Sequence, residues 1–337
     1  MRFKNILFAA AAAMALTACS SDDEQSFVSQ FPEDGVMRFT TNLVDPTAVT
    51  TRASITGSDV NQNGQQFQVK IVNPTSATYS YFNTVQFDGT EWMPYDRMLW
   101  QNNTQAITVT AAYKQGKTFS DYDFIVGANL TVAADQSTET KLKQQDLLTM
   151  PTKTIANPSI EETLMQNGKL VINFYHALTK LDVTLDLANE FYKVDPKLNN
   201  ASDITEFTIK GTNAGYQFNA METANENYGT VTVTASTAAD ILANQYNFTA
   251  GTAESKHSTA KYEAIIVPQT IAAGQLTVSF KIGTRSFSWT NPQAYPLEQG
   301  KQYTLPLTVG NDGVTAGSRA FSVSSWENQP GDNLGTE

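Results

Sequence analysis

Short runs of alternating apolar and polar residues restrict the fold of this chain more than any other feature. From Leu276 to Ile282 every second side chain is apolar, and Thr277, Ser279 and Lys281 alternate with them. Because successive side chains of a β-strand point to opposite faces, this pattern is typical of a sheet with one wet side. Comparable runs recur at the spacing of sandwiches rather than of βα units, and helical periodicity is weak. We therefore predict an all-β protein.

The predicted strands are rich in Thr, Val, Tyr and Phe and are separated by Asn, Gly, Asp and Pro. They span residues 36–44, 66–72, 106–113, 169–174, 181–187, 204–209, 230–235, 264–267, 275–282, 302–309 and 320–326. The best candidates for short helices are residues 140–148 and 237–245.

The N-terminus has the pattern of a bacterial lipoprotein precursor. Arg2 and Lys4 precede the apolar run 6–16, and Leu16-Thr17-Ala18-Cys19 follows. This order predicts a signal peptide over residues 1–18 and acylation of Cys19 as the new N-terminus. A transmembrane helix is disfavoured, because the run is much shorter than the roughly 20 residues that a span needs.

Composition excludes several kinds of site. Cys19 is the only cysteine, so an acylated Cys19 leaves no disulfide, zinc cluster or thiol nucleophile in the folded part. Loss of residues 1–18 removes Arg2 and Lys4 and no acidic residue, which changes the formal net charge from −11 to −13. That charge argues against nucleic acid as a partner. Residues 19–35 are expected to form an acidic tether, although the tract 20–24 also resembles surface-export signals of Bacteroidetes lipoproteins.

The length of the mature chain, about 320 residues, is more than one hydrophobic core usually serves. Asp195-Pro196, Asn199-Asn200 and Asp203 interrupt two β-rich halves. We therefore expect an N-terminal domain over residues 36–190, a linker over 191–203 and a C-terminal domain over 204–337.

Evidence for an enzyme is poor. His176 and His257 are the only histidines, and neither has the spacing of a metal pair or of a catalytic triad. We expect His176 to be a structural histidine bonded to backbone, and His257 to lie in a surface loop. No catalytic residue, metal site or cofactor is predicted, and no carboxylate pair stands out for glycoside hydrolysis, the weakest of the functions considered.

Four tryptophans allow a second interpretation. Trp92, Trp100, Trp289 and Trp326 either stack on sugar rings or pack in the core, and packing is favoured. If they are exposed, the chain is a glycan-binding surface lipoprotein that does not polymerise.

Arg52 lies in the small-residue stretch 49–54, which has no strong strand or helix signal. An extended backbone at Arg52-Ala53 suits the cleft of a trypsin-like protease. Without further context, an ordinary exposed arginine is the simpler interpretation.

Several motifs together resemble the fimbrillin family of Bacteroidetes, the subunits of type V pili, and in particular its Mfa-like branch. They are the segment ending at Cys19, Thr51-Arg52-Ala53, Asp146-Leu147-Leu148, residues 174–181 (FYHALTKL), Val267-Pro268-Gln269-Thr270 and residues 297–303 (LEQGKQY). The sequence departs from the commoner pattern at Thr149-Met150, where alanine is expected after Leu148.

The resemblance implies two tandem transthyretin-like β-sandwich domains and a lipoprotein anchored in the outer membrane through Cys19. It further implies that an arginine-specific protease cuts after Arg52, before Ala53. The subunit then polymerises by strand exchange with other pilin subunits, both further copies and accessory tip or anchor pilins, into a cell-surface fimbrium that supports adhesion.

The alternation along residues 36–44 shows what that cut would remove. Met37, Phe39 and Leu43 share one face of the strand, and their burial stabilises the domain by roughly 5 to 8 kcal/mol at about 1.5 to 3 each. The vacated groove would need a replacement strand.

The candidate donor of that strand is the segment 320–326. Phe321 and Val323 share one face, and Trp326 falls on the other. A bulge, an end of pairing or a shorter donor each account for the position of Trp326.

Overall fold

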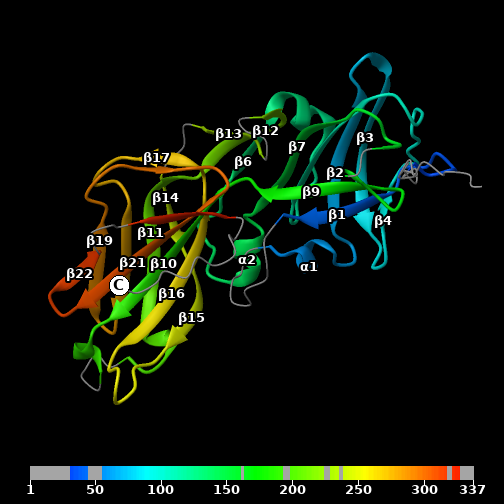
Figure 1. The fold of residues 1–337 in the computed structure, drawn as a ribbon. Coiled ribbons are helices and arrows are strands. Elements are labelled where there is room, and N and C mark those ends of the chain that lie inside the picture. Colours follow the sequence, from blue (N-terminus) through cyan, green and yellow to red (C-terminus); the bar gives the residue numbers. More distant parts are fainter. Residues whose placement is uncertain are drawn as a thin grey trace, which may run out of the picture.

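The computed structural model describes residues 31–44, 55–160, 163–192, 198–223, 228–234, 238–316 and 321–326, and in these residues the protein is all-β, as predicted. Figure 1 shows two strand-rich parts side by side, one built mainly from the N-terminal half and one from the C-terminal half. Helical structure in the described part of the chain is limited to short pieces, chiefly α1 (Gly57–Val60) and α2 (Glu139–Lys143). No helix among the described residues has both the length and the apolar character needed to cross a membrane.

The N-terminal sheet is a closed ring of seven strands. Its order is β1-β4-β3-β2-β5-β7-β9, and a further pairing of β1 with β9 closes it. These strands are β1 (Phe39–Leu43), β2 (Gln66–Asn73), β3 (Ser76–Phe87), β4 (Trp92–Pro94), β5 (Ile107–Lys114), β7 (Leu147–Ile155) and β9 (Lys169–His176), with the two-residue β8 (Met165–Gln166) attached to β9. The prediction of two transthyretin-like sandwiches did not anticipate this closed sheet.

The C-terminal half of the sequence forms two larger sheets and, with β6 (Ala128–Thr131) from the N-terminal half, two small ones. The first has the order β15-β16-β10-β21, with β22 and β23 both paired to β21, and the second has the order β14-β11-β18-β19. Their strands are β10 (Thr179–Leu187), β11 (Ile204–Asn213), β14 (Ala238–Leu242), β15 (Asn244–Thr249), β16 (Ser258–Ile266), β18 (Thr277–Ile282), β19 (Arg285–Thr290), β21 (Lys301–Gly310), β22 (Gly313–Ala316) and β23 (Ser322–Ser325). The small sheets are β13 (Gly229–Val233), β12 (Gly215–Thr223) and β6 (Ala128–Thr131), and β17 (Gln269–Ile271) with β20 (Tyr295–Leu297).

The strictest alternation in the sequence lies where it was expected. In β18, Val278, Phe280 and Ile282 are buried and the residues between them are partly exposed. The apolar face of β18 packs into the C-terminal core, so this strand has one dry and one wet side as predicted.

Two hydrophobic cores divide the molecule. One gathers buried residues from Met37 to Phe174 inside the ring. The other contains the buried apolar residues from Ala177 onward together with several earlier ones, among them Ala112, Phe124 and Leu147. The two cores therefore interleave along the sequence between Ala112 and Phe174, and from Ala177 onward the described apolar core residues belong to the second. Phe191 and Leu198, from the stretch predicted as a linker, pack into the second core.

One helix expectation is wrong and the other is partly right. The described part of the range 237–245 contains β14 and the start of β15 instead of a helix, because β14 pairs with β11 and buries Ile241 in the second core. Their alanine content favours a helix only weakly, and tertiary packing overrides it. In the other predicted helix, residues 140–148, α2 ends at Lys143 and β7 begins at Leu147.

Candidate functional site

The predicted strand 36–44 contains β1, which completes the N-terminal ring. The register pairs residues 39–43 of β1 in parallel with residues 170–174 of β9. On the other side, Phe39 lies opposite Trp92 of β4, and Val36 forms an isolated bridge with Leu99. β1 is therefore held by a continuous ladder on one edge and by few pairings on the other.

The inner face of β1 is anchored in the aromatic part of the core. Met37 and Phe39 are buried and Leu43 is half-buried. The ring of Phe39 packs edge to face on that of Phe67, with 6.1 Å between the ring centroids. The centroid of Phe67 in turn lies 5.6 Å from that of Phe174 in β9. Loss of β1 would expose this cluster, because Phe39 covers one of its sides.

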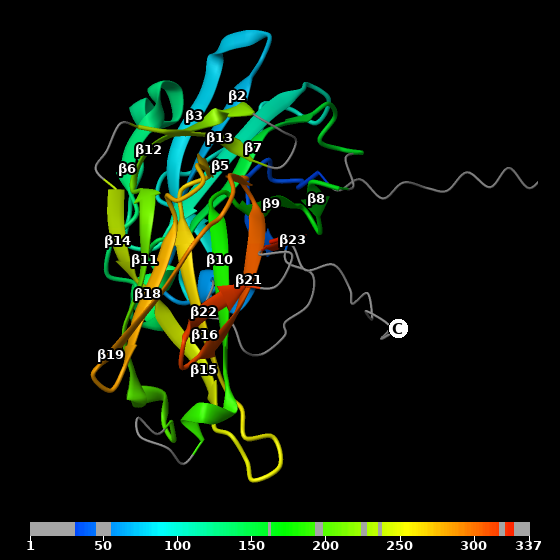
Figure 2. The same cartoon turned by 90° about the vertical axis from the view of Figure 1, so that its left-hand side faces the viewer.

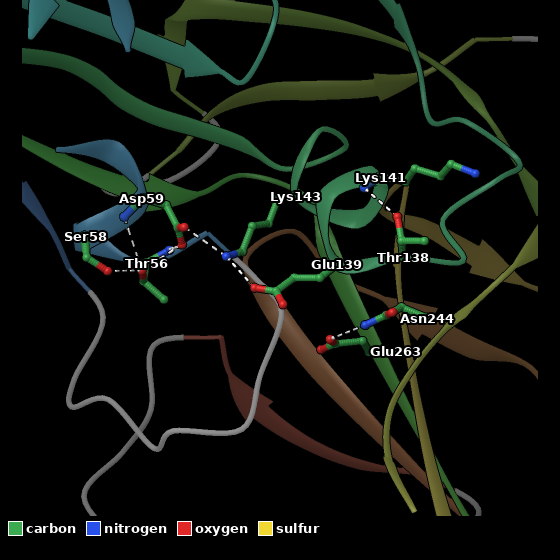
Figure 3. Close-up of polar contacts among 9 residues, drawn as sticks. All are labelled: Thr56, Ser58, Asp59, Thr138, Glu139, Lys141, Lys143, Asn244 and Glu263. Carbon is green, nitrogen blue, oxygen red and sulfur yellow. Dashed lines mark hydrogen bonds and ion pairs between the residues drawn. The ribbon is translucent and has the colours of Figure 1, made fainter. Parts of the chain in front are cut away.

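Polar contacts fix the chain where it resumes after the predicted cleavage site. Thr56 caps α1 and accepts a hydrogen bond from the Asp59 amide, while Asp59 Oδ2 accepts one from the Thr56 amide at 2.8 Å. The ammonium of Lys143 in α2 pairs with Asp59 at 2.9 Å and with Glu139 at 2.7 Å (Figure 3). Ile55, immediately before the cap, is fully buried. The position of the chain is therefore fixed from Ile55 onward.

The charges of Asp59, Lys143 and Glu139 stabilise one another. Burial alone would raise the pKa of Asp59, but hydrogen bonds from Lys143 and Thr56 outweigh it and lower that pKa. Burial alone would lower the pKa of Lys143, and its bonds to Glu139 and Asp59 raise it instead. The ion pair therefore remains charged at neutral pH.

The lipidation and cleavage predictions concern parts of the chain that are not described. Cys19, Arg52 and Ala53 all lie outside the described residues, which stop at Val44 and resume at Ile55. The ends of this interval are nevertheless clear. The Val44 amide donates to the Phe174 carbonyl at 2.9 Å on one side, and Ile55 is buried on the other.

The predicted donor segment lies in its own subunit. β23 pairs antiparallel with β21, and both strands are labelled in Figure 2. In this register Val323 lies opposite Tyr303. Phe321 packs edge to face on Tyr295 at 4.4 Å, Val323 is 54% exposed, and Trp326 is buried. The role of Phe321, Val323 and Trp326 in a neighbouring subunit stays a prediction.

Trp326 packs at a specific site, which we call its seat, formed by His176 and Gly300. Its ring stacks on the ring of His176 at 4.3 Å, with 6° between the planes. His176 Nδ1 lies 2.9 Å from Asp146 Oδ2, and both side chains are fully buried. His176 is therefore structural as predicted, but the expected backbone partner is wrong. A carboxylate 30 residues away in the chain takes that place.

Gly300 completes the seat. Its carbonyl accepts a hydrogen bond from the Trp326 amide at 3.0 Å, and its own amide donates to Leu178 at 2.9 Å. Its φ is +67°, and a Cβ there would come within 2.1 Å of the Tyr228 ring, so only glycine fits. Three of the motifs that carry the family resemblance, at Asp146, residues 174–181 and residues 297–303, thus converge beneath Trp326.

The remaining candidate residues, the tryptophans and His257, show no arrangement of a binding or catalytic site. All four tryptophans are buried, so none presents a ring face to a sugar, and the glycan-binding interpretation loses the exposed aromatics on which it depended. His257 lies at the surface as expected, 3.0 Å from Asp186. No group of three or more His, Cys, Asp and Glu side chains in the described parts of the chain is arranged to hold a metal ion.

One buried ion pair was not identified from the sequence. Lys180 Nζ lies 2.6 Å from Glu263 Oε2 in the second core, and Asn244 donates to the other oxygen of Glu263 at 3.2 Å (Figure 3 draws Asn244 and Glu263). These residues come from three neighbouring strands, β10, β16 and β15. The sequence does carry a signal for this pair, because the charged Glu263 stands within the otherwise apolar run of residues 262–267.

Comparisons with known proteins agree with this architecture. The chain is similar to the structure of a candidate cell adhesion protein from Bacteroides uniformis, with 17% identity and a TM-score of 0.54 over 88% of this chain and 99% of that one. A second candidate cell adhesion protein, from Bacteroides ovatus, gives 16% identity and a TM-score of 0.57 over 88% and 98%. At such identities the likeness concerns the fold. A search of curated proteins gives no match. A family model described as fimbrillin-like matches residues 51–326, most of the sequence, and the chain therefore belongs to the fimbrillin-like family.

Proposed function

We propose that this protein is a structural, non-enzymatic subunit of a type V pilus. In this proposal it is exported as a lipoprotein acylated at Cys19, cut after Arg52 and polymerised on the cell surface by donor-strand exchange. Its partners are other pilin subunits, the arginine-specific protease and, before cleavage, the outer membrane. Membership of the fimbrillin-like family supports a fimbrial role.

The single observation that carries the proposal is that β1 closes the N-terminal ring. β1 lies upstream of Arg52, so a cut there would separate it from the rest of the subunit. Its departure would uncover the sites of Met37 and Phe39, worth roughly 1.5 to 3 kcal/mol each, and would leave unpaired backbone on β9 and β4. An open ring of this kind favours capture of a new strand.

The C-terminal segment remains our candidate for that strand. To donate it, a subunit must first give up the pairing of β23 with β21 and the seat of Trp326. We also propose that the two cores correspond to the two predicted transthyretin-like domains, with β9 as the last strand of the first and β10 as a strand of the second. The predicted domain limits at residues 190 and 204 would then move toward the N-terminus.

The test uses Arg52→Ala, with Arg97→Ala as a matched control at an exposed arginine of the same domain. We expect wild type and the control to give surface protein that begins at Ala53 by intact mass and that forms polymers on denaturing gels. Arg52→Ala should stay a lipidated monomer. Polymers from Arg52→Ala without a cut elsewhere would refute the cleavage mechanism, and wild-type surface protein that keeps its lipid at Cys19 would refute the maturation step.

A further inference from the structure

The strand β9 connects the two mobile partners of the proposed mechanism. At one end it pairs with β1, where Leu43 lies opposite Phe174 and the Val44 amide donates to the Phe174 carbonyl. Two residues later, on the same buried face, His176 carries the stacked ring of Trp326. Thus β1 and Trp326, the residue that follows β23, both contact β9 within a stretch of three residues.

The central part of β9 depends on β1 for its pairing. β8 pairs with Lys169 and Leu170, and β7 pairs with Tyr175 and His176. Among the described strands, only β1 pairs with the residues between them, Val171 to Phe174. Loss of β1 would therefore leave this stretch without a strand partner, directly before the histidine that supports Trp326.

β23 is held mainly by the aromatic residues at its two ends. β23 pairs with β21 over four residues, and no other described strand pairs with it. Its Val323 side chain is exposed. Phe321 is half-buried against Tyr295, and Trp326 is almost completely buried on His176, which makes Trp326 the more deeply buried of the two anchors. A short edge strand of this kind is stabilised mainly by its buried anchor.

We propose that the stack of Trp326 on His176 is a lock that keeps the C-terminal strand in its own subunit while β1 occupies the ring. Removal of β1 frees the central part of β9, the support at His176 loosens, and β23 is released. This inference rests on the proposed strand exchange, and it explains how one cut can both open an acceptor groove and free a donor strand.

Thermodynamic linkage makes the lock testable from the opposite end. If docked β1 stabilises β23, then docked β23 must stabilise β1 by the same free energy. A change confined to Trp326 should therefore loosen β1, although the two contact different parts of β9. Simple local damage at the C-terminus would not reach β1.

The experiment measures hydrogen exchange of the uncleaved full chain and of three variants. Trp326→Ala removes the stacked ring, Trp326→Phe keeps an aromatic ring, and Ser324→Ala changes an exposed residue of the same strand. For Trp326→Ala we expect amide exchange at residues 40–44 to rise by roughly 5- to 150-fold, the usual range of coupling between sites. Trp326→Phe should restore most of the protection, and Ser324→Ala should match wild type.

A reference strand separates coupling from general destabilisation. The β18–β19 hairpin belongs to the C-terminal half, as β23 does, and neither of its strands pairs with β9 or β23. The lock requires that β1 gain more exchange than this hairpin. Equal gains in both, or unchanged exchange in β1, would overturn the proposal.

A second arm follows the cut itself. After cleavage at Arg52, exchange at residues 322–325 of freshly cut monomer should rise by a similar factor. If the chain is cut and β23 keeps its protection, the lock is wrong while strand exchange still stands. If Arg52 is not cut, the proposed maturation fails, and the variants of the uncleaved chain still decide the lock.

Discussion

Lys180 and Glu263 form an ion pair of 2.6 Å inside the second core, where both side chains are almost completely shielded from water. Removing one partner of such a pair leaves an uncompensated buried charge, which typically costs about 3 to 5 kcal/mol. Replacing both by apolar residues of similar size is often far less damaging. The pair is thus expected to be strongly coupled in stability.

We predict that Glu263→Gln and Lys180→Met each lower the free energy of unfolding by about 3 to 5 kcal/mol, and that the double variant loses much less than the sum. Denaturant unfolding of the four proteins measures the coupling. The exposed pair Lys210–Asp240, at 3.5 Å, serves as a control and should contribute less than about 1 kcal/mol. Additive losses at Lys180 and Glu263 would contradict the prediction.

Lys114 gives the molecule a predictable pH dependence. Burial lowers the pKa of its ammonium to about 8, although Asp146 acts in the opposite direction, and its nearest acceptor is the Gln144 carbonyl at 2.6 Å. The unfolded chain keeps the ordinary value of about 10.5. Between pH 8 and about 10.5 the unfolded state therefore binds more protons, so this group makes stability rise with pH across that window.

Lys114→Met should remove this rise. At pH 7 the variant should be more stable than wild type by roughly 1 to 3 kcal/mol, because a shift of one pKa unit corresponds to about 1.4 kcal/mol and the lost hydrogen bond to Gln144 offsets part of the gain. The advantage should shrink as the pH approaches 10. Lys117→Met, at an exposed lysine nearby, should follow the wild-type profile. If the difference in stability between Lys114→Met and wild type stayed constant from pH 7 to 10, the ionisation of Lys114 would not contribute to it.

The elements that could be predicted from sequence are those with a local signal. The face of the strand 36–44 that holds Met37 and Phe39 follows from a period of two residues, and burial confirms it. The closure of the ring has no such signal. It joins residues 39–43 to residues 170–174 by parallel pairing, and no turn or spacing in the sequence specifies that contact.

The same limit explains the seat of Trp326. His176 was recognised as structural because it lies among aromatic residues at a strand end. Its carboxylate partner Asp146 and its ring partner Trp326 come from distant parts of the chain, so neither could be assigned from the neighbourhood of His176. Asp146, His176 and Gly300 belong to separate sequence motifs, and only the fold shows why they occur together.

The N-terminal prediction is independent of the fold. Cys19→Ala removes the only thiol that can accept the lipid, so we expect no incorporation of labelled palmitate and no surface delivery. Ser20→Ala is the matched control next to the same processing site. Equal labelling of Cys19→Ala and wild type would exclude Cys19 as the lipidated residue.

Val323 provides the sharpest test of the donor assignment. In the uncleaved subunit its side chain is 54% exposed, so Val323→Asp should leave the melting temperature of the monomer nearly unchanged. In a neighbour's groove Val323 would share the buried face with Phe321, and an unpaired carboxylate there costs several kcal/mol. Cleaved Val323→Asp subunits should therefore accept a strand but not donate one, and should cap growing polymers when mixed with wild type. Val323→Thr, which keeps the branched shape, is the control and should retain part of the ability to donate a strand. Normal growth of polymers from Val323→Asp alone would show that this face of β23 never enters an apolar groove, and the donor would then have to be sought elsewhere in the chain.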